Sequence, residues 1–193
     1  MKVNAMGLAC PQPVIEAKKA LEAMESGTVE VHVDNAIARE NIKKLANKMG
    51  YPFEVKEEGD RIVVTIVKGE STGQEVVSND LAPQTIAIAS ETMGRGDEDL
   101  GKILMKGFLY TLTESHPYPK MLVFYNGGVK LACEGAESLE DLRKLEAAGV
   151  EILVCGTCLN YFGLSDKLAV GSVSNMYDIV EALKGADNTL IMS

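Results

Sequence analysis

The sequence predicts an α/β protein with an N-terminal βαβαββ two-layer sandwich and a C-terminal, Rossmann-like domain built on a parallel sheet. Three observations support this fold class. Strand and helix patterns alternate up to residue 69, and a stretch rich in Gly, Ser, Asn and acids follows at 70–83. Beyond it, continuous apolar runs alternate with amphipathic helices, as in buried parallel sheets. We therefore expect domains at 1–69 and 84–193, joined by a linker at 70–83.

The first domain opens with a short strand, KVNAM, and a helix, PQPVIEAKKALEAM, which Gly27 brings to an end. TVEVHVD alternates valines with polar residues, as a half-buried strand does. NAIARENIKKLANKMG repeats its apolar residues at helical spacing and stops at Gly50. YPFEVKEE and DRIVVTIVK flank a Gly59–Asp60 turn and predict a hairpin. These elements form a small sheet with two helices on one face.

The second domain contains four predicted strands, which are QTIAIAS, KMLVFYN, VEILVC and NTLIM. Between them lie three amphipathic helices, LGKILMKGFLYTLTES, SLEDLRKLEAAG and SNMYDIVEALKGA. Ser138 and Asp141 have the spacing of a helix-capping pair. Strands that alternate with helices form parallel sheets, in which the chemistry lies at the carboxyl ends of the strands.

Composition excludes several classes of function. The 193 residues carry a formal net charge of -9, which disfavours direct binding to nucleic acid. No run approaches the ~18 apolar residues of a membrane-spanning helix. The start, MKVNAMGLAC, has no apolar segment typical of a secretory signal. We expect a cytoplasmic protein with no membrane partner.

The chain has four cysteines, at positions 10, 133, 155 and 158. Without a secretion signal, an even number of cysteines indicates reactive or metal-binding thiols rather than structural bridges. MGRGDED has glycines but neither a dinucleotide nor a Walker signature. No cofactor or bound metal is therefore expected, and Cys133 is interpreted as a buried apolar residue.

Cys10 lies in GLACPQP, between a glycine turn and two prolines. Pro11 suits a first helical turn, and Pro13 follows two residues later. The start of a helix favours a thiolate through its dipole and its free N–H groups, which Gln12 and Val14 would supply. Gly7 permits the turn that exposes the sulfur. The alternative is a small thiol packed under the helix.

The segment VCGTCLNYFG holds Cys155 and Cys158 as a C-x-x-C pair between a strand and a helix, with Gly156 and Thr157 between them. Three functions remain open: a zinc half-site, a disulfide oxidoreductase, and a carrier of persulfide or selenide. A fourth possibility is two structural thiols. We expect Cys155 to be the less accessible sulfur and the activated thiolate, with Cys158 as its resolving partner.

A second loop is expected beside this pair. Gly127 and Gly128 follow the apolar run KMLVFYN and permit an unusual backbone turn at the carboxyl edge of the sheet. Neighbouring parallel strands would bring the loop close to Cys155. The alternative is a plain tight loop without a role in the site.

MGLACPQPVIEAKKAL resembles the TusA/SirA family of small βαβαββ domains, which carry sulfur on the cysteine of a C-P-x-P motif. Cys10, Pro11 and Pro13 match that motif, whereas Asn4 stands where many members have an acid. The second half is similar to the DsrE/DsrF-like family. FYNGGVKL, CGTCLNYFGL and VGSVSNMYDIV resemble the two-domain YedF-type group, which is associated with selenium metabolism.

The resemblance implies a sulfur or selenium carrier or transferase, with Cys10, Cys155 and Cys158 as the reactive residues. Its partners would be sulfur or selenium donor and acceptor proteins. The resemblance and the apolar segments YFGL and NMY both predict a homo-oligomer formed through the C-terminal domain. The alternatives are an adaptor or regulatory binding protein without turnover and a structural zinc protein.

Overall fold

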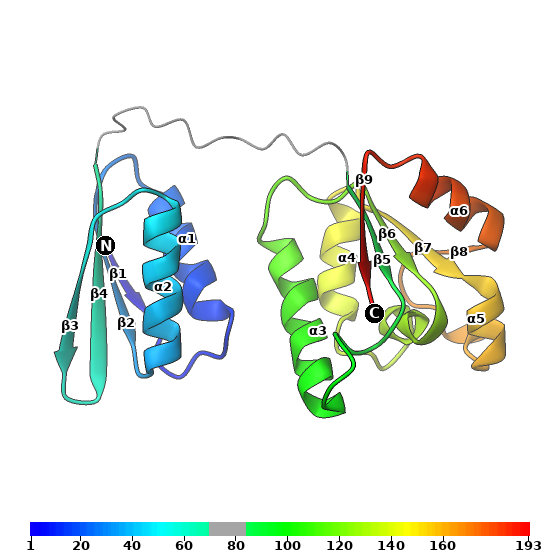
Figure 1. Ribbon diagram of the computed structural model, residues 1–193, viewed down its shortest axis with the longest axis horizontal. Helices are drawn as coiled ribbons and strands as arrows, with labels where there is room; N and C mark the ends of the chain where they lie inside the picture. The colour runs from blue at the N-terminus through cyan, green and yellow to red at the C-terminus, as the bar shows by residue number, and fades with distance from the viewer. Residues whose placement is uncertain (70–83) are drawn as a thin grey trace. The chain divides into compact units, whose positions relative to one another are not determined.

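The computed structural model describes residues 1–69 and 84–193, which belong to two compact units (Figure 1). The predicted linker at 70–83 lies outside the described residues. The two units differ in topology, and each has its own hydrophobic core.

The first unit has the βαβαββ order that the sequence predicts. Its elements are β1 (Lys2–Asn4), α1 (Gln12–Glu22), β2 (Gly27–Val33), α2 (Ala36–Lys48), β3 (Phe53–Glu58) and β4 (Arg61–Lys68). The strand order is β1-β2-β4-β3, with β1 parallel to β2 and the other pairs antiparallel. Both helices cover the same face of this sheet (Figure 1).

The alternating sequence of β2 decides which face of the sheet is covered. Val29, Val31 and Val33 are fully buried and pack in one core with Leu21 of α1 and Ile42 of α2. Successive side chains of a strand point to opposite faces, so the polar residues between these valines face away from the helices. Burial of these apolar side chains is the main force that holds the helices to the sheet.

The second unit is a parallel α/β fold, as expected. Its elements are β5 (Gln84–Ile88), α3 (Glu98–Thr113), β6 (Met121–Phe124), the 3₁₀ helix η1 (Asn126–Ala132), α4 (Leu139–Ala147), β7 (Glu151–Cys155), α5 (Gly156–Tyr161), the 3₁₀ helix η2 (Ser165–Lys167), β8 (Ser172–Ser174), α6 (Met176–Lys184) and β9 (Asn188–Met192). The strand order is β8-β7-β6-β5-β9, and every pair is parallel.

Three details of the second unit differ from the sequence prediction. Strand β8 was not predicted, because its three residues are too few for a periodic pattern. The loop after β6 is the 3₁₀ helix η1. Ser138 precedes α4 but makes no capping hydrogen bond, because its hydroxyl donates to the carbonyl oxygen of Leu131 at 2.7 Å.

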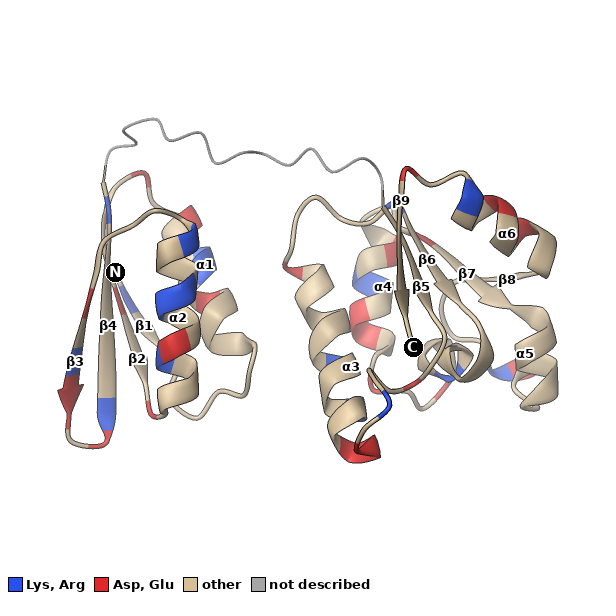
Figure 2. Cartoon of the chain, viewed as in Figure 1, with Lys and Arg blue, Asp and Glu red and all other residues tan. Residues whose placement is uncertain are grey.

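Charge is distributed unevenly between the units (Figure 2). Residues 1–69 contain ten Lys and Arg and ten Asp and Glu, so the net charge of -9 arises entirely from the rest of the chain. Six of the ten bases lie on α1 and α2. Among the described residues, no helix is both long enough and apolar enough to cross a membrane.

Candidate functional site

Cys10 is an exposed free thiol immediately before the N-cap of α1, which is Pro11. The loop that carries it turns at Gly7, whose φ of 74° lies in the left-handed region that glycine adopts without strain. The Gly7 N–H donates to Oδ2 of Asp34 at 2.6 Å. The predicted exposure of Cys10 at a helix start is confirmed.

The expected free N–H groups at the start of α1 are absent, and that part of the sequence prediction is wrong. The Gln12 N–H donates to the carbonyl oxygen of Ala9 at 2.9 Å, and the Val14 N–H donates to that of Pro11 at 3.1 Å. Pro11 and Pro13 have no N–H to offer. This turn therefore leaves neither of these two N–H groups free to donate to the Cys10 sulfur.

Asp34 is a site residue that the sequence analysis missed. It follows β2 and accepts hydrogen bonds from the Gly7 N–H and from Nδ2 of Asn35, at 2.6 and 2.9 Å. These two bonds, with the Gly7 bond the stronger, hold the pKa of Asp34 below its ordinary value. The side chain ties the Cys10 loop to the segment before α2. Its signal in the sequence was an Asp-Asn pair between a strand and a helix.

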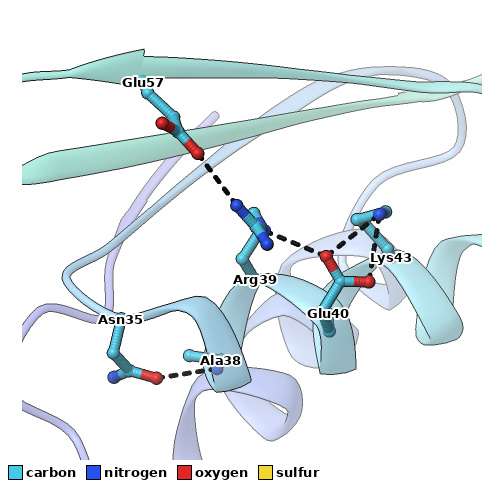
Figure 3. A network of polar contacts seen from close by, with 6 residues as sticks. All are labelled: Asn35, Ala38, Arg39, Glu40, Lys43 and Glu57. Carbon is cyan, nitrogen blue, oxygen red and sulfur yellow. Dashed lines mark hydrogen bonds and ion pairs between the residues drawn. The ribbon is translucent and has the colours of Figure 1, made fainter.

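Helix α2 is fixed at its start by side chains (Figure 3). Asn35 is the N-cap, and its Oδ1 accepts from the Ala38 N–H at 2.8 Å. One turn later, Nη1 of Arg39 donates to Glu57 of β3 at 2.8 Å, and its Nε donates to Glu40 at 3.0 Å. The contact between Arg39 and Glu57 joins α2 to β3, an edge strand of the sheet.

A small cavity of about 30 Å³ lies between the Cys10 loop and α2. Its lining includes Cys10, Pro13 and Val14 from the first helix and its approach, and Asn35 and Asn41 from the second. A space of this size holds roughly one atom or one water molecule. The exposed Cys10 thiol therefore has free space beside it for an added atom.

Cys155 and Cys158 form a second thiol site at the carboxyl end of the parallel sheet. Cys155 ends β7 and is the N-cap of α5, and its side chain is only 1% exposed. Cys158, one turn into α5, is partly exposed. Their Sγ atoms lie 3.0 Å apart, with the Cys158 S–H as the donor. The lower accessibility predicted for Cys155 is confirmed, whereas the roles within the pair stay a prediction.

The loop after β6 contacts this pair through a backbone donor. The Asn126 N–H donates to Sγ of Cys158 at 3.1 Å. Asn126 has a φ of 48°, which asparagine tolerates better than most residues. The unusual turn thus falls on Asn126, and not on the following glycines as expected. This backbone donor was another group that sequence reasoning missed.

Gly128 has a different structural role from the unusual backbone turn that the sequence predicts. A Cβ at this position would lie 2.1 Å from the carbonyl oxygen of Ile88, at the end of β5. A Cβ at Gly127 would make only ordinary contacts, at 3.8 Å or more. Gly128 therefore allows η1 to approach β5 closely, and that approach holds Asn126 against Cys158.

The pKa of the Cys158 thiol is raised above its ordinary value. Burial is the main cause, and the hydrogen bond to Cys155 adds to it, while the Asn126 N–H acts in the opposite direction. In this arrangement the Cys158 sulfur keeps its proton and donates it to Cys155. Cys155 is therefore the sulfur of the pair that receives a hydrogen bond from a thiol.

Gly156 and Thr157, the two residues inside the C-x-x-C motif, have unequal importance. A Cβ on Gly156 would come within 2.9 Å of Cγ1 of Val173 and 3.3 Å of the carbonyl oxygen of Ser174. The turn from β7 into α5 thus packs closely on β8. Thr157 is exposed, and we assign it no contact in the site.

Cys133 lies apart from the pair. It is 2% exposed, and its Sγ–H donates to the carbonyl oxygen of Val129 at 3.2 Å. Burial raises the pKa of its thiol. It contributes to the wall of a cavity of about 660 Å³, together with Lys130 and Phe162. Within residues 1–69 and 84–193, no three His, Cys, Asp or Glu side chains are grouped to hold a metal ion.

Comparison with known families divides the chain in the same way as its topology. Residues 1–68 match the family described as sulfurtransferase TusA. Residues 103–191 match the DsrE/DsrF-like family. The cysteine with the C-P-x-P pattern falls in the first match, and the C-x-x-C pair falls in the second.

Two relatives are similar to the first unit over nearly their whole length. A protein of Archaeoglobus fulgidus named "Putative sulfur carrier protein" is 42% identical over 72 residues, which are 35% of this chain and 94% of the relative. A Bacillus subtilis protein named "Putative sulfur carrier protein YrkI" is 36% identical over 69 residues, which are 35% of this chain and 92% of the relative.

Two solved structures each resemble a part of the chain. The SirA-like protein from Desulfitobacterium hafniense is 47% identical and covers 36% of this chain and 97% of its own, with a TM-score of 0.34. The ychN protein from E. coli is 19% identical and covers 56% of this chain and 98% of its own, with a TM-score of 0.45.

Proposed function

We propose that this chain carries a sulfane-type sulfur atom on cysteine. The chain belongs to the TusA family through residues 1–68 and to the DsrE/DsrF-like family through residues 103–191. The observation that carries the proposal is the placement of Cys10. Its thiol is exposed at a helix start, on a loop fixed by Asp34, beside a space for one atom. Relatives of this unit are named as sulfur carriers.

The loading step transfers one sulfur atom from a persulfide to a thiol. The Cys10 thiolate attacks the terminal sulfur of a donor persulfide, R–S–SH, and forms a Cys10 Sγ–S bond. The S–S bond of the donor breaks, and R–S⁻ leaves and takes up the proton. An acceptor thiolate removes the atom from Cys10 by the same reaction. No external oxidant or reductant is needed, because one S–S bond replaces another.

In the second unit we assign the accepting role to Cys158 and the resolving role to Cys155. An incoming persulfide can reach Cys158, whereas Cys155 is almost fully buried. Cys155 nevertheless lies 3.0 Å from Cys158 and is placed to attack it as a thiolate. In this order Cys155 still reacts as a thiolate, as the sequence predicts. Cys158 now reacts first and Cys155 resolves, whereas the sequence analysis made Cys158 the resolving partner.

Resolution releases the carried atom in reduced form. The Cys155 thiolate attacks Sγ of the Cys158 persulfide, a Cys155–Cys158 disulfide forms, and HS⁻ leaves. The sulfane sulfur gains the two electrons that the dithiol loses. A cellular thiol such as glutathione must then reduce the disulfide before the next cycle. Selenium would follow the same steps, with a perselenide on Cys158 and hydroselenide as the product.

The partners of this chemistry are proteins that donate or accept sulfur or selenium. We also infer self-association through the second unit. Tyr161 and Tyr177 are 83% and 74% exposed, and Val173 and Met176 are exposed as well. All four lie on α5, β8 and α6, around the C-x-x-C pair and an edge strand. Light scattering at micromolar concentration is expected to give a mass above that of one chain, and a monomer would contradict this inference.

Labile sulfur is the quantity that tests the carrier function. The purified protein is incubated with cysteine persulfide, desalted, and treated with dithiothreitol, and the sulfide released is measured. Wild type is expected to release sulfide, and Cys10→Ser to lose the share held by the first unit. Cys133→Ser is the matched control and should release as much as wild type. Parallel loading with selenide and glutathione disulfide tests for selenium.

The same experiment separates the carrier from the alternative function, a non-enzymatic adaptor in the same pathway. An adaptor would hold no labile sulfur above the level of a variant without Cys10, Cys155 and Cys158. The acidic charge outside the first unit is compatible with docking on a basic partner.

A further inference from the structure

Ser174 has a hydroxyl group that the fold buries and leaves without a partner. The residue ends strand β8 and is 8% exposed. Within the described residues, its Oγ makes no hydrogen bond. Most buried side-chain polar groups in proteins are paired, so an unpaired one requires an explanation. A buried hydroxyl group with no partner lowers the stability of the fold, so its presence at this position points to a role other than a structural one.

The neighbour of Ser174 on the adjacent strand is Cys155. The two residues are paired in the parallel register of β7 and β8, and both are buried. Paired residues of neighbouring strands share a face of the sheet, and the strands lie about 4.8 Å apart. Gly156, which has no Cβ to meet the carbonyl oxygen of Ser174, allows β8 to pack closely on the start of α5. The Ser174 and Cys155 side chains therefore project from adjacent positions on one face of the sheet.

The hydrogen bonds of the dithiol explain when this donor is needed. In the unloaded pair, the Cys158 S–H donates to Cys155, and Asn126 donates to Cys158. Once Cys158 carries an added atom, its Sγ no longer has a proton to donate. Cys155 thus loses its donor at the step in which it must react as a thiolate. Ser174 is the unpaired buried donor beside it.

We propose that Ser174 donates its hydroxyl hydrogen to the Cys155 sulfur when Cys158 is loaded and so stabilises the attacking thiolate. The inference rests on the resolving step of the proposed function and gives Ser174 a positioning role within it. The Cys155 thiolate attacks Sγ of Cys158, the bond from Sγ to the carried sulfur breaks, and HS⁻ leaves. The hydroxyl group keeps its proton throughout.

Few ionisable groups act on Cys158. Cys155 is the one titratable side chain that acts on Cys158 through its charge, among the groups of the described ranges. The remaining contact from η1 is the uncharged Asn126 N–H. A pH profile of the resolving step therefore reports on the two thiols and their hydrogen-bond donors rather than on a neighbouring acid or base.

The first test measures sulfide release from loaded protein. Wild type, Ser174→Ala, Ser174→Thr and Ser172→Ala are loaded with inorganic polysulfide and desalted, and release without reductant is followed across the range in which thiols ionise. We expect Ser174→Ala to shift the midpoint of the profile upward by about one pH unit, a roughly tenfold slower release near neutrality. Ser174→Thr, which keeps the hydroxyl, should restore the profile, and Ser172→Ala should match wild type.

The second test does not depend on sulfur loading. The same variants are treated with glutathione disulfide, and the rate at which Cys155 displaces glutathione from the Cys158–glutathione mixed disulfide is measured. Ser174→Ala is expected to slow this displacement several-fold, because Cys158 in the mixed disulfide has no proton to donate to the Cys155 thiolate. If wild type takes up no sulfur but Ser174→Ala slows the displacement, the carrier function fails and the role of Ser174 stands.

Thermal unfolding distinguishes this role from a structural one. Ser174→Ala should leave the Tm unchanged or raise it, because an unpaired buried hydroxyl is replaced by a methyl group. Two results would overturn the proposal. One is a release profile and a rate of glutathione displacement that both equal those of wild type. The other is a Tm that falls while the chemistry is unchanged.

Discussion

The Sγ atoms of Cys155 and Cys158 lie 3.0 Å apart, yet only Cys158 is open to solvent. A hidden thiol in contact with an accessible one is suited to resolving a persulfide rather than to accepting it. A disulfide requires the two sulfurs to approach to about 2.05 Å, a small movement from their present positions. The pair is therefore arranged for a sequence of two reactions.

Replacing each thiol of the pair in turn should separate loading from release. Cys155→Ser is expected to retain a sulfur atom on Cys158 and to release it only when a reductant is added. Cys158→Ser is expected to leave this unit unloaded, because the remaining thiol is buried. Mass spectrometry of the peptide that contains residues 155–158 checks both. Loading of Cys155 in the Cys158→Ser variant would reverse the assigned roles.

Gly128 and Gly127 provide a matched pair of substitutions. Gly128→Ala places a Cβ against the Ile88 carbonyl oxygen, so η1 must shift. We expect a loss of ~1–3 kcal/mol in the free energy of unfolding, and slower sulfur uptake by Cys158 as the Asn126 donor moves. Gly127→Ala should change stability by less than about 1 kcal/mol. Urea unfolding measures this difference, and equal losses for the two variants would refute the close-approach explanation.

Asp34 should make the Cys10 loop sensitive to acid. Its pKa in the folded protein is lowered by the Gly7 N–H, so its stabilising contribution is present above the unfolded pKa. That contribution is lost as the pH falls through the lower, folded pKa. The NMR shift of the Gly7 amide proton should titrate with a midpoint below 3.8, the ordinary value for aspartate.

Two variants control this titration. Asp34→Asn keeps an oxygen acceptor for the Gly7 N–H and should abolish the titration. Asp60→Asn changes a carboxylate in the β3–β4 turn and should leave the midpoint unaltered. A midpoint at or above 3.8 in wild type would show that the carboxylate does not hold the loop.

The Cys133 thiol is expected to be unreactive toward persulfide donors in the folded protein. Its thiol is buried, its pKa is raised, and its proton is engaged by Val129. Cys133→Ala should cost ~1 kcal/mol of stability and leave sulfur loading unchanged. Peptide mapping after treatment with a persulfide donor measures this directly. Sulfur found on Cys133 in the folded protein would contradict its structural role.

The periodicity of apolar residues in the sequence was sufficient to predict most of the fold. The valines of β2 alternate strictly, and the strands of the second unit are continuous apolar runs, so the two kinds of sheet could be predicted. Strand β8 could not, because three edge residues without an apolar pattern carry no periodic signal. Its omission also concealed Ser174.

The reactive thiols could be predicted, but the groups that hold them could not. Cys10, Cys155 and Cys158 stand in recognisable local motifs. Asp34 and Asn126 reach those thiols or their loops across 27 and 32 residues of sequence. Such contacts depend on how strands pair and how closely loops approach. The assumed donors at the start of α1 were wrong for a local reason, because the turn itself uses both N–H groups.

Mass spectrometry of the Cys10 peptide after incubation with cysteine persulfide tests the carrier function most directly. We predict that this peptide gains the mass of one sulfur atom, that dithiothreitol removes it, and that an added acceptor thiol takes it up. The Asp34→Ala variant, whose Gly7 loop has lost its acceptor, should hold less. A Cys10 peptide that stays unmodified while the donor is consumed would contradict the account.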